Sequence, residues 1–178
     1  MNGAMTGSGG RMKRGHDARQ SAFSAMLCDC EPIIRKISRT YCWDEEPRRD
    51  LAQEIQLELW RAWPRYDAGR PIRAWVYRVA LNVAIDYVRS STRRPRTIEL
   101  DPEIPDGMPL DEQVDGAILL ERTIRSAEPF DRAMLLLFLE GHDHADIAAI
   151  VGTSESNVST RLHRLKARLS AHYREAGR

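Results

Sequence analysis

Residues 95–116 divide this chain into two parts that we expect to fold separately. The segment contains prolines at positions 95, 102, 105 and 109, and every charged residue between Thr97 and Gly116 is acidic. A segment of this composition cannot bury enough apolar surface to fold by itself, and its prolines interrupt regular helices and strands. We therefore expect a flexible, acidic, proline-rich linker between a first domain over residues 18–94 and a second over residues 117–174.

The overall charge and hydropathy exclude some broad classes of protein. The formal net charge is only +1, so the surface is not uniformly basic, as it is in some nucleic-acid-binding proteins. Charge must therefore be judged segment by segment. No stretch approaches the roughly 20 apolar residues of a membrane span. Residues 1–17 contain cations and glycines without the apolar run of a signal peptide, so we expect a disordered tail there. These features predict a cytoplasmic protein without membrane insertion of its own.

The three cysteines, Cys28, Cys30 and Cys42, are an odd number, which argues against a structural disulfide framework. The Cys28-Asp29-Cys30 spacing is too short for a common zinc site, although Cys42 or His16 could in principle join it. We favour small, half-buried apolar side chains, with no metal and no cofactor. No pairing of nucleophile and base, phosphate-binding loop or metal-ligand spacing indicates an enzyme.

The first domain is predicted to be helical. Apolar residues over positions 19–41 allow one or two helices, and a further helix is expected over residues 48–63. The buried edge of the latter is predicted at positions four residues apart, Leu51, Ile55 and Leu59. On its other faces Leu57 lies among carboxylates. That arrangement suits a docking face for a basic, partly apolar partner helix, although the helix taken alone favours a solvated charged face.

The stretch from Arg70 to Arg89 is predicted to form the next helix, because Gly69 and Pro71 suit a helix start. Its buried stripe is expected at Ile72, Val76, Val79 and Val83. The other faces combine cations, flat aromatic rings and an amide, which single-strand nucleic-acid binding uses to hold phosphates, stack on bases and reach base edges. These side chains are Arg73, Trp75, Tyr77, Arg78, Asn82, Tyr87 and Arg89. An ordinary amphipathic helix with core aromatics and solvated arginines fits the stretch equally well.

The second domain is predicted to be a bundle of short helices. Residues 133–139 are apolar almost all round, as expected for a buried helix. We expect Gly141 to end that helix and Gly152 to end the next one, over residues 144–151, while Ser154 caps a final helix. This arrangement is a helix-turn-helix layout: a helix of about eight residues, then a tight glycine turn, then a second helix whose first turns are polar.

The final helix of this layout has two contrasting faces. Its predicted core stripe is Val158, Leu162, Leu165 and Leu169. The opposite face carries polar and cationic side chains of the kind that reach base edges and hold phosphates in a major groove. These are Asn157, Ser159, Thr160, Arg161, His163, Arg164, Lys166 and Arg168. The alternative is a domain with the same helix-turn-helix layout that packs only on protein and does not bind DNA.

Both halves together resemble bacterial sigma factors of the sigma-70 superfamily, specifically the small two-domain extracytoplasmic-function group, group IV. In the first half, Asp50-Leu51-Ala52-Gln53-Glu54-Ile55 followed by Leu59-Trp60 is similar to that family's clamp-binding helix. Residues 73–82 and 84–89 resemble its segment for strand melting and −10 recognition. In the second half, the similarity to its −35-reading helix-turn-helix lies in Asp146-Ile147-Ala148, Gly152, Asn157-Val158 and Arg161-Leu162-His163-Arg164.

The resemblance implies an all-α fold, with a sigma region 2-like helical bundle and a sigma region 4-like helix-turn-helix domain. It implies a non-enzymatic mechanism in which the protein docks on core RNA polymerase, at the β′ clamp helices and the β subunit, and reads promoter DNA. An anti-sigma factor is the usual regulator in this group and is expected here. Two rival interpretations are a stand-alone helix-turn-helix transcription regulator and a polymerase-binding adaptor.

The resemblance also distributes roles among the residues, with Asn82 expected to capture a flipped base of the −10 element. Core polymerase binding is expected of Asp50, Gln53, Glu54, Leu57 and Glu58. Strand melting and −10 recognition are expected of Arg73, Trp75, Tyr77, Arg78, Asn82, Asp86 and Arg89. Binding of the −35 element is expected of Asn157, Ser159, Thr160, Arg161, His163, Arg164, Lys166 and Arg168. In this last set, Arg161, Lys166 and Arg168 are expected to hold phosphates.

Overall fold

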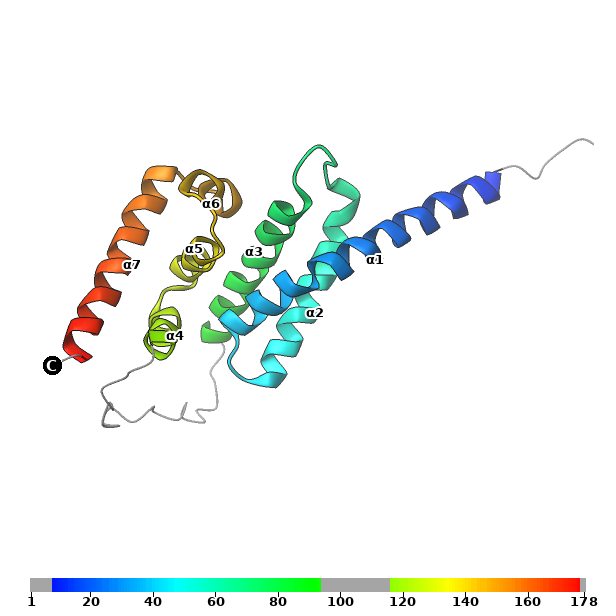
Figure 1. Ribbon diagram of the computed structural model, residues 1–178. Helices are drawn as coiled ribbons and strands as arrows, with labels where there is room; N and C mark the ends of the chain where they lie inside the picture. The colour runs from blue at the N-terminus through cyan, green and yellow to red at the C-terminus, as the bar shows by residue number, and fades with distance from the viewer. Residues whose placement is uncertain (1–7, 94–115, 177–178) are drawn as a thin grey trace, which may run out of the picture.

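The computed structural model describes residues 8–93 and 116–176, and these fold into helices with no strand among them (Figure 1). The elements are α1 (Ser8–Tyr41), α2 (Glu45–Ala62), the short 3-10 helix η1 (Trp63–Arg65), α3 (Ile72–Arg93), α4 (Gly116–Ser126), α5 (Pro129–Leu139), α6 (His144–Val151) and α7 (Glu155–Ala176). The predicted all-α class is therefore confirmed. The expected linker, apart from its last residue, lies outside the described residues.

Helices α1, α2 and α3 pack on one another and form the first domain. The predicted inner edge of α2 is confirmed, because its three apolar residues, Leu51, Ile55 and Leu59, are all fully buried. They meet the apolar side of α1, where Ile34 and Ile37 are buried as well. The expected one or two helices over residues 19–41 are a single helix, which contains Pro32 without ending there.

The N-terminal part of α1 differs from the expected tail. The helix begins at Ser8, so residues 8–17 are helical rather than disordered. Once the segment around Phe23 and Met26 is held in the core, each further helical residue adds a hydrogen bond without a new nucleation cost. This part of α1 projects away from the other helices (Figure 1).

Helices α4 to α7 form the second domain, with α5 at its centre. As predicted, α5 is buried almost all round, and Ala133, Met134 and Leu137 are completely inaccessible to solvent. The exception is Leu139, at the end of the stretch predicted to be buried, which is 49% exposed. The core stripe of α7 is confirmed at Val158 and Leu162, and Leu165 continues it. The side chain of Leu169 lies outside the described part of the structure.

Helix α6 and the turn that follows it are fixed by capping residues. Asp143 caps the start of α6 by accepting a hydrogen bond from the backbone N–H of Asp146 at 2.8 Å. Gly152 ends α6 with a φ of 74°, in the left-handed region that disfavours residues with a Cβ. The predicted cap Ser154 is confirmed, because its Oγ accepts from the backbone N–H of Asn157 at 3.2 Å. Gly152 and Ser154 together set the direction in which α7 leaves α6.

Replacing Gly152 with Ala is expected to destabilise the second domain by about 1–2 kcal/mol, because a Cβ is strained at this φ. Nothing lies within 4 Å of the added Cβ, so the whole loss comes from the backbone and none from a clash. Urea unfolding followed by circular dichroism measures it. The control Gly152→Asn should lose less, since Asn tolerates the left-handed conformation. Equal losses for both variants would contradict this explanation.

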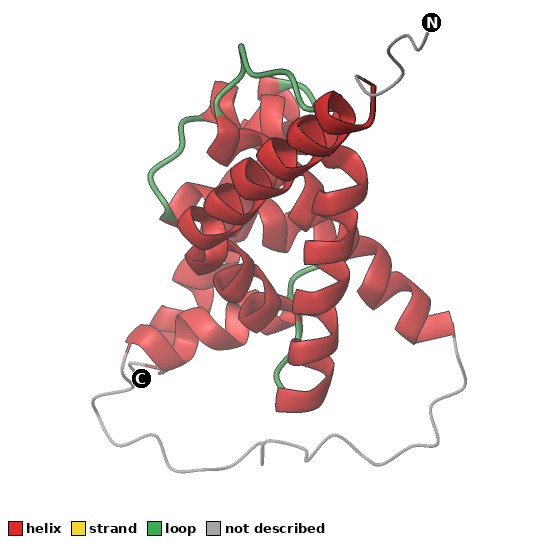
Figure 2. Cartoon of the chain, turned by 90° about the vertical axis from the view of Figure 1, so that its right-hand side faces the viewer, coloured by secondary structure: helices red, strands yellow, loops and turns green. Residues whose placement is uncertain are grey.

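The two domains pack on each other through α3, which contacts α1 and α2 on one side and α5 and α6 on the other (Figures 1 and 2). Because of this packing, the buried residues of α3 differ from the predicted stripe. Val76 is buried as predicted, whereas the other three residues expected in the stripe, Ile72, Val79 and Val83, are half-buried. The buried line continues instead through Tyr77, Ala80, Leu81, Ala84 and Ile85. A helix with packing partners on both sides buries more than one face.

Candidate nucleic-acid interface

The residues expected to melt the promoter do not share one environment on α3. Arg73, Arg78, Asn82, Asp86 and Arg89 are exposed. Trp75 is half-buried, and Tyr77 is only 3% exposed. The helix therefore presents cations and an amide to solvent, while its three aromatic rings, Trp75, Tyr77 and the half-buried Tyr87, are partly or fully covered.

Trp75 belongs to an aromatic cluster that the sequence did not reveal. The rings of Trp63 and Tyr66 are stacked, 5.3 Å apart and 9° from parallel. The ring of Trp75 lies 5.0 Å from Tyr66 and 6.0 Å from Trp63. The Tyr66 hydroxyl donates a 2.6 Å hydrogen bond to the carbonyl oxygen of Arg70. This bond stabilises the loop that connects η1 to α3. All three rings are half-buried, so the cluster is a firmly held platform of the kind on which an unpaired base can stack.

Asn82 lies in a groove of about 500 Å³ between α2 and α3. The groove is also lined by Glu54 and Glu58 of α2 and by Asp86 of α3. The structure thus brings together residues expected to contact polymerase and residues expected to contact the −10 element. Arg61 also lines the groove, 3.5 Å from Glu58, so three carboxylates face a single guanidinium and the groove is acidic on balance. Carboxylates repel a phosphate backbone but accept hydrogen bonds from the exocyclic amines of bases, so the groove favours a base edge over a phosphate.

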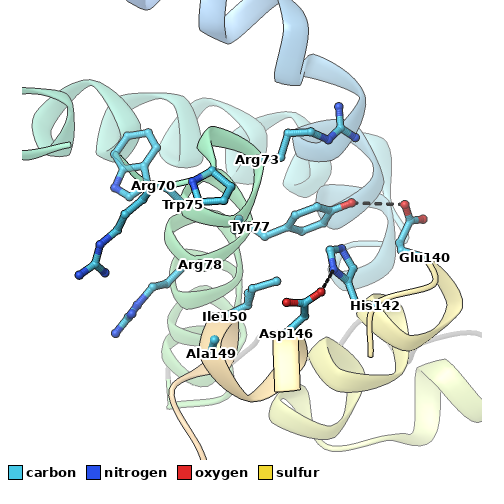
Figure 3. A pocket seen from close by; sticks show the side chains of 12 residues that line it. Arg70, Arg73, Trp75, Tyr77, Arg78, Glu140, His142, Asp146, Ala149 and Ile150 are labelled. Atoms are coloured by element: carbon cyan, nitrogen blue, oxygen red, sulfur yellow. Dashed lines mark hydrogen bonds and ion pairs between the residues drawn. The ribbon is translucent and has the colours of Figure 1, made fainter. Parts of the chain in front are cut away.

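Tyr77 points toward the second domain (Figure 3). Its hydroxyl donates a hydrogen bond to Oε2 of Glu140 at 3.3 Å, and its ring meets that of His142 edge-on, with centroids 5.5 Å apart. Burial, and next the charge of Glu140, raise the pKa of Tyr77 to about 12. In this structure the Tyr77 ring is therefore a contact between domains and is not available for stacking.

The face of α2 opposite its buried edge combines charge with exposed apolar surface. Asp50, Gln53 and Glu54 are exposed and Glu58 is half-buried. The side chain of Leu57 is 47% exposed and that of Trp60 is 38% exposed. The ring of Trp60 is held at one edge by Phe23, 4.9 Å away. Such a mixed face suits a protein partner, and Trp60 was absent from the set expected to bind polymerase, although it lies in the motif that suggested this role.

On α7, the predicted DNA-binding residues fall into two groups. The first group makes contacts within the domain. Arg161 donates to Asp131 of α5 at 2.6 Å, Asn157 donates to the Thr153 hydroxyl at 2.8 Å, and the ammonium of Lys166 lies 3.9 Å from the Phe138 ring centroid. Arg168 lies 3.9 Å from the other oxygen of Asp131. Arg161, Lys166 and Arg168 thereby help to hold α7 on α5, whereas Asn157 fixes the start of α7 to the turn before it.

The second group on α7 faces solvent. It consists of Ser159, Thr160, His163 and Arg164, all exposed. The Thr160 hydroxyl donates back to the Ser156 carbonyl oxygen at 2.9 Å, and no ion pair in the described part of the chain engages Arg164. The second group therefore presents the donors and acceptors that a major groove could meet.

Other candidate chemistries find little support in the described ranges. Cys28 is exposed, whereas Cys30 and Cys42 are buried. Burial raises the pKa of the Cys30 thiol, which makes it a packing residue rather than a nucleophile. Over residues 8–93 and 116–176, no three His, Cys, Asp or Glu side chains form a group that could hold a metal ion. None of the helices described is both long and apolar enough for a membrane span.

Both halves of the chain are similar to known proteins. A family model described as Sigma-70 region 2 matches residues 29–94, and one described as Sigma-70, region 4 matches residues 120–169. The RNA polymerase sigma factor CnrH of Cupriavidus metallidurans is 28% identical over 167 residues, which cover 85% of this chain and 86% of CnrH. The ECF RNA polymerase sigma factor SigM of Mycobacterium tuberculosis is 27% identical over 140 residues, covering 77% of this chain and 69% of SigM.

The fold also matches solved structures. The sigma factor RpoE of Bartonella quintana, crystallised with the anti-sigma factor NepR, superposes with a TM-score of 0.63 at 18% identity. The match covers 84% of this chain and 95% of the RpoE chain. At this identity the likeness speaks for the shared fold of both domains.

Proposed function

The chain belongs to the extracytoplasmic-function group of the sigma-70 family, and from this premise we propose how its helices share the work of transcription initiation. As a sigma factor it directs core RNA polymerase to specific promoters and initiates strand opening. In the proposed division, α2 docks on core polymerase, α3 opens and reads the −10 element, and α7 reads the −35 element. The observation that carries this division is the groove between α2 and α3, where the exposed Asn82 lies beside Glu54 and Glu58.

We assign polymerase docking to the outer face of α2. Leu57 and Trp60 supply exposed apolar area, while Asp50, Gln53 and Glu54 supply polar and acidic contacts around it. A basic, partly apolar helix pair such as the β′ clamp helices is complementary to this face. Glu54 and Glu58 also line the groove that contains Asn82, so docking on the clamp would complete one wall of the base-binding site.

We assign capture of a flipped −10 base to Asn82, with the half-buried ring of Trp75 as a stacking surface nearby along α3. Flipping costs a few kcal/mol, which contacts in the pocket must offset. An amide can pair with a base edge in two places at once, whereas Arg73, Arg78 and Arg89 are exposed cations suited to the phosphates of the separated strand.

We assign −35 readout to the second group on α7, Ser159, Thr160, His163 and Arg164. The first group contributes mainly by holding the helix in place, because Arg161 and Asn157 are already engaged within the domain. Lys166 and Arg168 are exposed enough to approach phosphates as well. These four are the side chains that the resemblance assigns to base reading, and the hydrogen bond of Asn157 to Thr153 supports leaving Asn157 out of that set.

We further propose that an anti-sigma factor regulates this chain. The fold neighbour RpoE was crystallised with the anti-sigma factor NepR, and the mixed face of α2 is an exposed surface that such an inhibitor could compete for. Co-purification of the chain with the product of a neighbouring gene, followed by loss of transcription on adding that product back, tests this regulation.

The decisive experiment for the proposed function is run-off transcription with core RNA polymerase and this chain. Promoter-specific product that requires the chain is expected. Absence of product with bound polymerase would favour the adaptor interpretation. Tight, specific binding of duplex promoter by the chain alone would favour the stand-alone helix-turn-helix regulator. Sequencing transcripts induced by overexpression supplies the promoters for these assays.

Arg164→Ala is expected to weaken the dependence of transcription on the −35 element by roughly 1–3 kcal/mol, if Arg164 contacts two acceptors of one base. Comparing promoters with intact and scrambled −35 elements measures this. Lys166→Ala is the matched control, since a phosphate contact loses similar affinity on both templates. An equal loss for Arg164→Ala on intact and scrambled promoters would assign Arg164 to a phosphate instead.

A further inference from the structure

A cavity of about 610 Å³ lies between the start of α3 and the segment from Glu140 through α6 (Figure 3). Its size falls within the usual range of pockets that hold a small molecule. Two helix faces form most of its lining, because residues three or four apart in a helix share one face. The first face is on α3, with Arg73, Ala74, Tyr77 and Arg78, and the second is on α6, with Asp146, Ala149 and Ile150. The cavity is therefore a candidate site for a small ligand.

The ring of Trp75 gives the cavity a flat apolar surface. This ring is half-buried, and its neighbours Tyr66 and Trp63, at centroid distances of 5.0 and 6.0 Å, hold it in place. Pro71 and Ile150 add further apolar surface to the lining. A ring that is already fixed loses little conformational entropy when a planar heterocycle stacks on it, and every nucleic-acid base has a suitable face. This side of the cavity favours a ligand with a planar base.

Three guanidiniums of the first domain line the same cavity. Arg73 and Arg78 are exposed, and no ion pair in the described part of the chain engages either of them. Arg70 lies 3.6 Å from Asp67 and lines the cavity as well. Figure 3 shows the guanidiniums of Arg70 and Arg78 pointing to the same side of the cavity. Because a guanidinium binds two oxygens of one phosphate at once, this side favours a ligand that carries phosphate groups.

The two carboxylates that line the cavity differ in how far they are engaged. Glu140 forms an ion pair with Lys36 and accepts a hydrogen bond from the Tyr77 hydroxyl, so its charge is already balanced. Asp146 is more open, because its side chain is 67% exposed and its nearest ionisable partner, the His142 imidazole, lies 4.0 Å away. A carboxylate repels phosphate but accepts hydrogen bonds from the amines and ring N–H groups of bases. Asp146 on α6 therefore marks the base end of the cavity, across from Arg78 on α3.

We propose that this cavity binds a free nucleoside phosphate. The base stacks on Trp75 and donates to Asp146, and the phosphates bind Arg78 and Arg73. A free nucleotide suits the cavity better than a nucleic-acid strand, because α6 stands opposite α3 and a strand would have to continue past this wall at both ends. The bound nucleotide covers Trp75 and Arg78 and thereby competes with the −10 strand; this consequence alone rests on the proposed function.

Calorimetric titration of the full chain tests the proposal, with ADP and GDP as probes. Adenosine and inorganic pyrophosphate are the controls, because each carries only one of the two parts that the cavity is expected to recognise. At least one diphosphate should bind about tenfold or more tightly than either control, since phosphate hydrogen bonds and base stacking then contribute together. Arg78→Gln should weaken diphosphate binding about tenfold and leave the affinity for adenosine unchanged. No binding of either diphosphate up to about 1 mM, or equal affinity for pyrophosphate, overturns the proposal.

Filling the cavity from the α6 side shows whether the ligand lies inside it. Ala149→Trp adds a large side chain at an exposed residue of the lining and is expected to weaken diphosphate binding by about tenfold or more. Ala145→Trp is the matched control, because Ala145 is also exposed on α6 but does not line the cavity. It should bind the diphosphate as the wild type does. Thermal unfolding followed by circular dichroism checks that both variants are folded. Unchanged binding in folded Ala149→Trp overturns the proposal.

A single-stranded oligonucleotide separates the two sources of the same chemistry. If Ala149→Trp blocks binding of the oligonucleotide while neither diphosphate binds the wild type, the cavity accepts a strand and the proposal of a free nucleotide is wrong. All these titrations use the chain without polymerase, so their failure leaves the proposed function untouched. Absence of promoter-specific transcription would instead refute the proposed function and leave the nucleotide site standing.

Discussion

Asn82→Ala is expected to leave core polymerase binding intact and to slow open-complex formation by about 100-fold. That factor corresponds to the few kcal/mol that flipping a base costs, which the variant no longer offsets in the groove. Asn82 is exposed, so its truncation should leave the stability of the first domain unchanged. Permanganate reactivity of unpaired thymines in the −10 region, followed over time, measures the effect.

Two further variants show what the Asn82 amide supplies. Asn82→Asp keeps an acceptor but replaces the donor with a fourth carboxylate beside Glu54, Glu58 and Asp86. It should be at least as defective as Asn82→Ala, because the added charge repels the strand and cannot donate to a base. Ser90→Ala, at an exposed position lining the same groove, should change little. Unchanged permanganate reactivity in Asn82→Ala would remove Asn82 from the melting mechanism.

The sequence predicted those features that depend on local pattern. Leu51, Ile55 and Leu59 recur every four residues, and that spacing alone determines which face of α2 is buried. The positive φ of Gly152 and the cap at Ser154 follow from the conformations these residue types favour. The helix-turn-helix layout was therefore recognisable without any knowledge of tertiary contacts.

The features that escaped prediction depend on partners far away in the chain. Tyr77 has a ring that suits a core and a hydroxyl that suits a surface, so its position on α3 fits both interpretations. Part of its cover comes from Glu140 and His142, more than 60 residues later in the chain, and periodicity does not indicate which segment will cover a face. Likewise, Arg161 resembles a DNA contact in the sequence until Asp131, 30 residues earlier, is found to accept its hydrogen bond.

Breaking the ion pair between Asp131 and Arg161 is expected to have the largest effect on stability. Asp131→Ala is expected to destabilise the second domain by about 2–4 kcal/mol, because Asp131 is 8% exposed and its removal leaves a partly buried guanidinium without its carboxylate. The pair joins α5 to α7, so the variant should also weaken −35 dependence by letting the recognition helix move. Urea unfolding and transcription from promoters with intact or scrambled −35 elements measure the two effects.

A double-mutant cycle separates support of α7 from direct DNA contact. If Arg161 acts mainly through Asp131, then Arg161→Met should lose stability and −35 dependence together. The double variant Asp131→Ala, Arg161→Met should then be more stable than Asp131→Ala alone, because no unpaired charge remains beneath α7. If Arg161 instead held a DNA phosphate, Arg161→Met would reduce DNA affinity on every promoter while unfolding at the same urea concentration as wild type. The two outcomes differ in the stability measurement, so the cycle assigns Arg161 to one role.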